Sequence, residues 1–148
     1  MSARTKKRGF TLIELLMVLV VLVAIAAIVI PKFYDRNKQA KEAALKSDLR
    51  ILRNAMASFQ ADNGCSPLTL NDLTATSAAN LSTADTGVDA SGNNTAVTGT
   101  FHGPYVQAVP NDPIAGTAFT YSTTAGSVGS VSSSASGNGL DGTAYSGY

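Results

Sequence analysis

The residue with the clearest chemical potential is Glu14, which interrupts an otherwise apolar stretch from Phe10 to Ile30. Every residue from Leu15 to Ile30 is hydrophobic. A charged side chain at the centre of a lipid-facing helix costs about 2.5 kcal/mol or more, so such residues are rare and usually functional. Glu14 is therefore a candidate functional residue.

The side chains that most often carry catalysis are scarce. His102 is the only histidine and Cys65 the only cysteine, so the chain cannot assemble a zinc site of the usual kind. The many serines lie in low-complexity sequence without a nearby base. We predict that the chain is not an enzyme. Cys65 is interpreted as a small buried hydrophobe, with an intermolecular link as the alternative.

Charge is distributed unevenly along the chain. The net charge is +1, yet all 11 Lys and Arg residues lie at or before Arg53. Four of them directly precede the apolar stretch, which is typical of a segment whose basic end stays on the cytoplasmic side of a membrane: Arg4, Lys6, Lys7 and Arg8. The later basic residues alternate with acidic ones, so a nucleic-acid-binding stripe is not favoured.

The segment Lys7-Arg8-Gly9-Phe10-Thr11-Leu12-Ile13-Glu14 resembles the prepilin leader motif of type IV pilins and type II secretion pseudopilins. The resemblance implies that a membrane-embedded prepilin peptidase cuts after Gly9 and that the new Phe10 amine is methylated. It further implies that Glu14 pairs with this amine of a neighbouring subunit in a helical filament.

Two other interpretations of the N-terminus stay open. One is an ordinary signal peptide, for which Ala24-Ile25-Ala26 fits the small-residue cleavage pattern. The other is a signal-anchor that carries a binding domain. A glutamate is unusual in a signal peptide, and the signal-anchor leaves Gly9 and Glu14 unexplained.

The elements that must position these residues begin with one long helix, predicted from about Phe10 to Asp62 and stopped by Asn63-Gly64. A kink or local break is expected at Pro31, which lacks an N–H group. The second half carries an apolar stripe with helical spacing, which predicts that it packs on a small domain: Leu45, Leu49, Leu52, Met56 and Phe59.

Beyond the helix we expect short elements separated by long loops. A short helix is predicted near Thr69 or Asn71, and residues 74–100 are predicted to be a surface loop with a short helix near Ala78. Two strands are expected at residues 118–122 and 128–132, and the tail near Tyr145 and Tyr148 could add another. The predicted fold is α+β. A long N-terminal helix, with a membrane-spanning first half and an amphipathic second half, packs on a small antiparallel sheet with long loops.

The order of turns after the long helix is similar to that of the major pseudopilins of type II secretion. It runs through Gly103-Pro104-Tyr105, Pro110-Asn111-Asp112-Pro113 and Phe119-Thr120-Tyr121. The resemblance implies a calcium site in the C-terminal loop, for which Asp112 and Asp141 are candidate ligands. A tight turn over residues 137–142 is the alternative interpretation.

We therefore expect a leader at residues 1–9, a transmembrane and filament-core helix at 10–30, and a periplasmic or extracellular domain at 31–148. The expected function is a structural subunit of a pseudopilus, or alternatively of a type IV pilus for adhesion, motility or DNA uptake. Expected partners are further copies of the chain, minor pilin-like subunits, the prepilin peptidase, an inner-membrane assembly platform and, before assembly, membrane lipid. Nucleic acid is a partner only for a DNA-uptake pilus. The expected location is the bacterial inner membrane, spanned once with the N-terminus in the cytoplasm.

Overall fold

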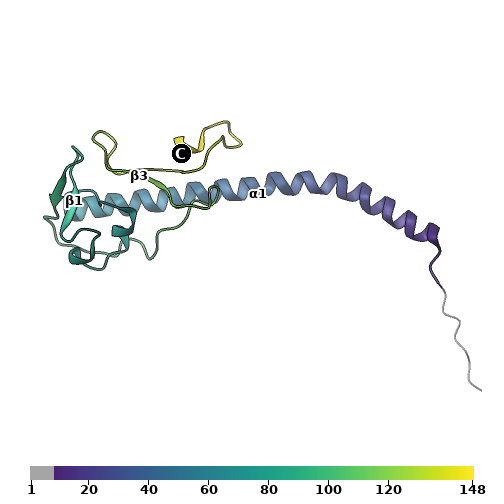
Figure 1. The fold of residues 1–148 in the computed structure, drawn as a ribbon, viewed down its shortest axis with the longest axis horizontal. Helices are drawn as coiled ribbons and strands as arrows, with labels where there is room; N and C mark the ends of the chain where they lie inside the picture. The colour runs from purple at the N-terminus through teal and green to yellow at the C-terminus, as the bar shows by residue number, and fades with distance from the viewer. Residues whose placement is uncertain (1–8) are drawn as a thin grey trace, which may run out of the picture. The chain divides into compact units, whose positions relative to one another are not determined.

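The computed structural model describes residues 9–148, except the side chains of residues 31–32 and 34–35. Its dominant element is the helix α1, Leu12–Asn63 (Figure 1). The chain divides into two compact units, residues 1–38 and 39–148, and α1 contributes to both. The predicted fold class is confirmed: a long N-terminal helix with an apolar first part, and small antiparallel sheets on its later part.

The described part of the first unit consists mainly of the apolar portion of α1. Within the described residues, Leu12–Ile30 is the one segment long and apolar enough to cross a membrane, with a mean hydropathy of 3.2. None of it is buried within the structure. The helix continues through Pro31 without a break, and a kink at this residue stays a prediction.

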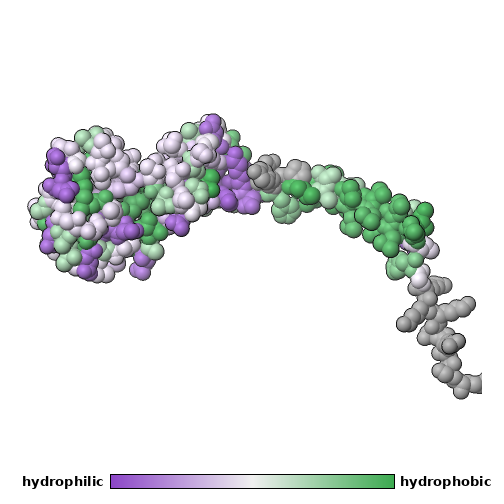
Figure 2. All heavy atoms as spheres, in the orientation of Figure 1, coloured by the Kyte–Doolittle hydropathy of each residue, from purple (hydrophilic) through white to green (hydrophobic). Residues whose placement is uncertain are grey.

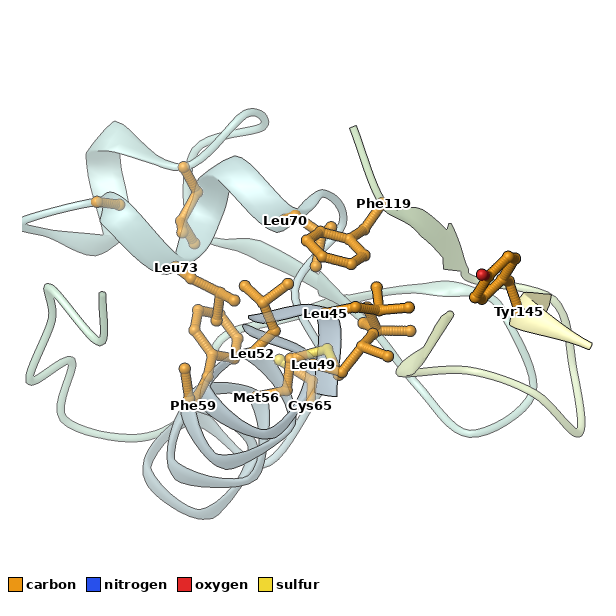
Figure 3. Close-up of a cluster of buried hydrophobic side chains, with 14 residues drawn as sticks. Leu45, Leu49, Leu52, Met56, Phe59, Cys65, Leu70, Leu73, Phe119 and Tyr145 are labelled. Atoms are coloured by element: carbon orange, nitrogen blue, oxygen red, sulfur yellow. The ribbon is translucent and has the colours of Figure 1, made fainter. Parts of the chain in front are cut away.

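The core of the second unit lies along the apolar stripe of α1, as predicted. Leu45, Leu52 and Phe59 are completely buried, and Leu49 and Met56 are nearly so. Figure 3 shows side chains from later parts of the chain packed against this stripe, among them Leu70, Leu73 and Phe119. No single loop of this unit has enough apolar residues to form a core by itself. Burial of apolar side chains against α1 therefore holds the second unit together.

Two two-stranded antiparallel sheets are present instead of the single sheet expected. β1, Thr86–Val88, pairs with β2, Asn94–Ala96, and places Gly87 opposite Thr95. β3, Thr120–Ser122, pairs with β4, Ser130–Ser132, and places Tyr121 opposite Val131. The predictions of strands at residues 118–122 and 128–132 are confirmed by β3 and β4.

Three expectations about the short elements have different outcomes. The helices predicted near Thr69 and Ala78 are confirmed as the 3-10 helices η1, Leu70–Thr74, and η2, Ala78–Asn80. The loop expected over residues 74–100 also contains the β1–β2 hairpin. The strand proposed for the tail is wrong, because the chain forms a 3-10 turn there, η3, Tyr145–Gly147.

The end of α1 matches the predicted stop. Gly64 follows the last helical residue with φ of 71°, and its N–H donates to the carbonyl of Gln60 at 2.9 Å. This left-handed conformation favours glycine and satisfies a carbonyl that the helix end leaves free. The Tyr105 hydroxyl braces the same end by donating to Asp62 and accepting from the Asn63 amide, both at 3.0 Å.

Candidate functional site

The predicted cleavage junction lies just before the helix. Gly9, Phe10 and Thr11 are exposed and non-helical, and α1 begins at Leu12. A Cβ added to Gly9 would meet no described atom within 4 Å, so packing in the described part of this chain does not require glycine at this position. The basic leader residues at positions 4 and 6–8 lie outside the described residues.

Glu14 and Thr11 cap the start of α1 reciprocally. The Glu14 carboxylate accepts hydrogen bonds from the Thr11 N–H at 2.9 Å and from the Thr11 hydroxyl at 2.8 Å. The Thr11 hydroxyl in turn accepts from the Glu14 N–H at 3.3 Å. This arrangement is a capping box, and it satisfies two main-chain donors that would otherwise lack partners. Thr11 was not among the predicted site residues, although Thr-x-x-Glu before an apolar run is the sequence signal for a capping box.

Figure 2 shows hydrophobic side chains, in green, along the visible face of the apolar part of α1. Every residue from Leu15 to Ile30 is hydrophobic, so the other faces of this part are apolar too. Leu12 and Ile13 in this part of α1, and Phe10 just before it, are exposed. A helix that is apolar all round is stable when lipid or other apolar helices surround it. Chemically, this N-terminal site offers an accessible peptide bond between Gly9 and Phe10 and one carboxylate, beside an exposed apolar surface.

The remaining residues considered for catalysis are in unreactive settings. Cys65 is 3% exposed, and burial raises the pKa of its thiol. A buried thiol with a raised pKa is a poor nucleophile. His102 is exposed and lies 3.7 Å from the Asp62 carboxylate. Both placements agree with structural roles.

Asp112, the first predicted calcium ligand, is completely buried and surrounded by hydrogen-bond donors. Its carboxylate accepts from the main-chain N–H groups of Ile114, Ala115 and Ser134 at 2.8, 3.1 and 3.1 Å, and from the Ser133 hydroxyl. Burial alone would raise the pKa of Asp112, but these four hydrogen bonds outweigh it and lower the pKa below its usual value.

Asp141, the second predicted ligand, is exposed and has a different set of partners. Its carboxylate accepts from the Tyr148 hydroxyl at 2.6 Å and the Thr143 N–H at 2.9 Å, and pairs with the Lys46 ammonium at 3.4 Å. Led by the Tyr148 hydrogen bond, these contacts hold the pKa of Asp141 well below its usual range.

These surroundings do not fit calcium, which needs six to eight oxygen ligands. Each of the two carboxylates already accepts from its own set of hydrogen-bond donors, and the Lys46 ammonium beside Asp141 would repel a cation. Asp48 is a further acid of this region, and burial and then the charge of Asp112 raise its pKa. Yet the described residues contain no group of three or more His, Cys, Asp or Glu placed to hold a metal.

Asp112 is therefore expected to stabilise the second unit as a hydrogen-bond acceptor. Replacing Asp112 with Ala leaves three N–H groups and a hydroxyl without a partner, which should lower the free energy of unfolding by about 3 kcal/mol. Asp112→Asn keeps one carbonyl oxygen for Ile114 and Ala115 and should lose about half as much. Chemical denaturation of a fragment of residues 39–148 measures both, and equal stability of Asp112→Ala and wild type would contradict this role.

The fold and the N-terminal site define a pilin-like structural subunit: one exposed apolar helix, a non-helical junction before it, and a small loop-rich unit on its later part. Residues 4–30 match the family model of the prokaryotic N-terminal methylation motif. Residues 32–145 match the model of type II secretion system (T2SS) protein G. The chain belongs to the T2SS protein G family, whose members are structural and not catalytic.

Individual relatives agree with this assignment. The chain is 38% identical over 72 residues to the type II secretion system core protein G of Pseudomonas aeruginosa, covering 49% of this chain and 51% of that protein. It is 34% identical over 73 residues to core protein G of Escherichia coli, covering 49% and 50%. It is also 41% identical over 54 residues to the type IV major pilin protein PilA of Myxococcus xanthus, covering 36% and 24%.

The chain thus spans about half the length of the protein G relatives that it matches. No solved structure matches it.

Proposed function

We propose that the chain is a subunit of the pseudopilus, the helical filament of type II protein secretion. The observation that carries this proposal is the family match over residues 32–145. The N-terminal motif is shared by pilins and pseudopilins, so the second unit is the part that separates them. The similarity to a type IV pilin extends over only 24% of that pilin.

In this proposal the first unit has two successive environments. The exposed apolar portion of α1 first anchors the precursor in the inner membrane, with the basic leader on the cytoplasmic side. After a prepilin peptidase removes residues 1–9, the same surface packs against other copies of the chain in the filament. Minor pilin-like subunits and an inner-membrane assembly platform are the further partners that we propose.

The exposed, non-helical junction supports the proposed processing. Gly9 and Phe10 precede the helix, so a peptidase could bind the peptide bond between them without first breaking helical hydrogen bonds. We propose that Phe10 is then methylated and that its amine pairs with the Glu14 carboxylate of a neighbouring subunit.

The mature N-terminus tests this processing directly. Intact-mass and N-terminal analysis of the chain from membranes that contain a prepilin peptidase should find methylated Phe10 as the first residue. The Gly9→Val variant should remain uncut, although Gly9 touches no described atom that such a change would disturb. A mature chain that starts at Ala27 would support an ordinary signal peptide and overturn the proposal.

A deletion experiment separates the pseudopilus from a type IV pilus. In a host with both systems, loss of the gene should leave secreted enzymes in the periplasm and leave surface pili and twitching unchanged. Normal secretion together with loss of surface pili would assign the chain to the pilus instead.

A further inference from the structure

The C-terminal segment, residues 138–148, is held to α1 by polar contacts that the proposed filament role does not call for. Within the segment, Asn138 and Ala144 form an isolated β-bridge and η3 follows. Three polar residues of α1 reach it: Glu42, Lys46 and Arg53. Their spacing of four and seven residues places them along one side of the helix.

Glu42 makes the most buried of these contacts. Only 7% of this residue is exposed. Its Oε1 atom accepts a hydrogen bond from the Leu140 N–H at 2.9 Å and another from the Tyr145 hydroxyl at 3.0 Å. Tyr145 itself is a core residue, and burial together with the neighbouring Glu42 carboxylate raises its pKa to about 12. A buried carboxylate is stable only with such partners.

Lys46 and Arg53 hold the remainder of the segment. The Lys46 ammonium lies 3.4 Å from the Asp141 carboxylate and 4.4 Å from the centre of the Tyr148 ring. The Arg53 guanidinium donates to the Val131 carbonyl at 3.0 Å and to the main-chain oxygen of Tyr148. Arg53 therefore links the end of the segment to β4 as well as to α1.

We propose that Glu42, Lys46 and Arg53 form a C-terminal latch that fastens residues 138–148 to α1 without calcium. The latch uses fixed positions on a helix, so little order has to be created when the segment docks. The Lys46 ammonium and two hydrogen-bond donors already contact Asp141, the one acidic residue of the segment. This proposal goes beyond the filament role and holds whether or not the chain serves secretion.

The first test measures the melting temperature of the whole chain in detergent micelles, once with calcium chloride and once with a chelator. Calcium at about 10 mM would saturate even a weak extracellular site. A bound ion at tenfold its dissociation constant would raise the melting temperature by several degrees. We expect melting temperatures within about 1 °C of each other. A rise of several degrees with calcium, lost in Asp48→Asn, Asp112→Asn or Asp141→Asn, would overturn the proposal.

The second test asks whether Glu42 fastens the segment. Hydrogen exchange of residues 138–148 in the same micelles should be roughly tenfold faster in Glu42→Ala than in wild type. Glu42→Gln keeps an oxygen that can accept from Leu140 and Tyr145, so its exchange should stay within about twofold of wild type. Unchanged exchange in Glu42→Ala would contradict the latch.

A surface variant covers the case in which Glu42→Ala does not fold. Lys46 is half-exposed, so replacing it with Ala leaves the core intact. Lys46→Ala should speed exchange in residues 141–148 and leave the amides of β3 and β4 unchanged. Equal hydrogen exchange of residues 141–148 in this variant and in wild type would overturn the proposed role of Lys46. The exchange rates of the Glu42 and Lys46 variants should not depend on calcium.

Discussion

Replacing Glu14 with Val in the whole chain should leave membrane insertion intact and almost abolish filaments. Insertion should persist because the apolar segment becomes more hydrophobic. Filaments should fail because the Phe10 amine of the neighbouring subunit would be buried without its proposed partner, and an unpaired buried charge is strongly destabilising. The measurement is the amount of chain in sheared filaments relative to the amount in the membrane fraction.

Glu14→Gln separates the two roles that the structure allows for this carboxylate. Glutamine keeps an oxygen that accepts from Thr11 and so preserves the helix cap, but it carries no charge. If the ion pair is what assembly needs, Glu14→Gln should assemble as poorly as Glu14→Val. Normal filament yield from Glu14→Gln would mean that Glu14 acts in assembly only by capping the helix, and would contradict the proposed ion pair.

The largest effect on stability is expected from Leu52→Asp, at a completely buried position of the α1 stripe. The change removes a leucine from the core and places an unpaired charge there, which together should cost about 5 kcal/mol or more. A unit of this size is stabilised by roughly 5–15 kcal/mol in total. The fragment of residues 39–148 should therefore be largely unfolded by this substitution, as circular dichroism and thermal melting would reveal.

The neighbouring residue provides a matched control. Ile51 is 50% exposed, so Ile51→Asp introduces the same charge one position away but on the solvent side of α1. Its effect should stay within about 0.5 kcal/mol, as for most surface substitutions. A well-folded Leu52→Asp fragment, or two variants that are equally unstable, would show that the core does not lie on the stripe.

The parts of the fold that could be predicted are those with a strong periodic signal. The stripe from Leu45 to Phe59 repeats every three or four residues, so both the helix and its buried face follow from spacing. Gly64 could be predicted as a stop because few residues other than glycine adopt a positive φ. The β3 and β4 strands have alternation and flanking turn residues.

The β1–β2 hairpin had no comparable signal. Its strands are only three residues long, and Gly87, Asn94 and Ala96 are of types that are depleted in strands. The hairpin depends instead on its turn, where the Asp89 carboxylate accepts from the N–H groups of Ser91 and Asn93 at 2.8 and 2.9 Å. The tail is a turn because Tyr145 packs into the core and Glu42 binds its hydroxyl, and this contact joins residues 103 positions apart.

For the candidate sites, the sequence was enough to select the residues but not to predict which groups surround them. Gly9, Phe10 and Glu14 lie together at the start of α1, and the roles assigned to them stay predictions. Asp112 and Asp141 were considered as ligands because they are acids in a turn-rich region. Only the structure shows that donors surround them, because Ser133, Ser134 and Lys46 are distant from them in sequence.

The capping box at Thr11 and Glu14 has a consequence for reversibility. Both hydrogen bonds from Thr11 reach the same carboxylate oxygen, Oε2, so the other oxygen can accept from a neighbour's amine while the cap stays formed. Because the carboxylate is already hydrogen-bonded in the single chain, the net driving force of the proposed pairing is smaller than that of joining two bare charges. A subunit that leaves the filament would keep its carboxylate bonded to Thr11 and so keep the start of its helix. In the proposed pseudopilus, the Glu14 carboxylate would then have hydrogen-bond partners during both growth and disassembly.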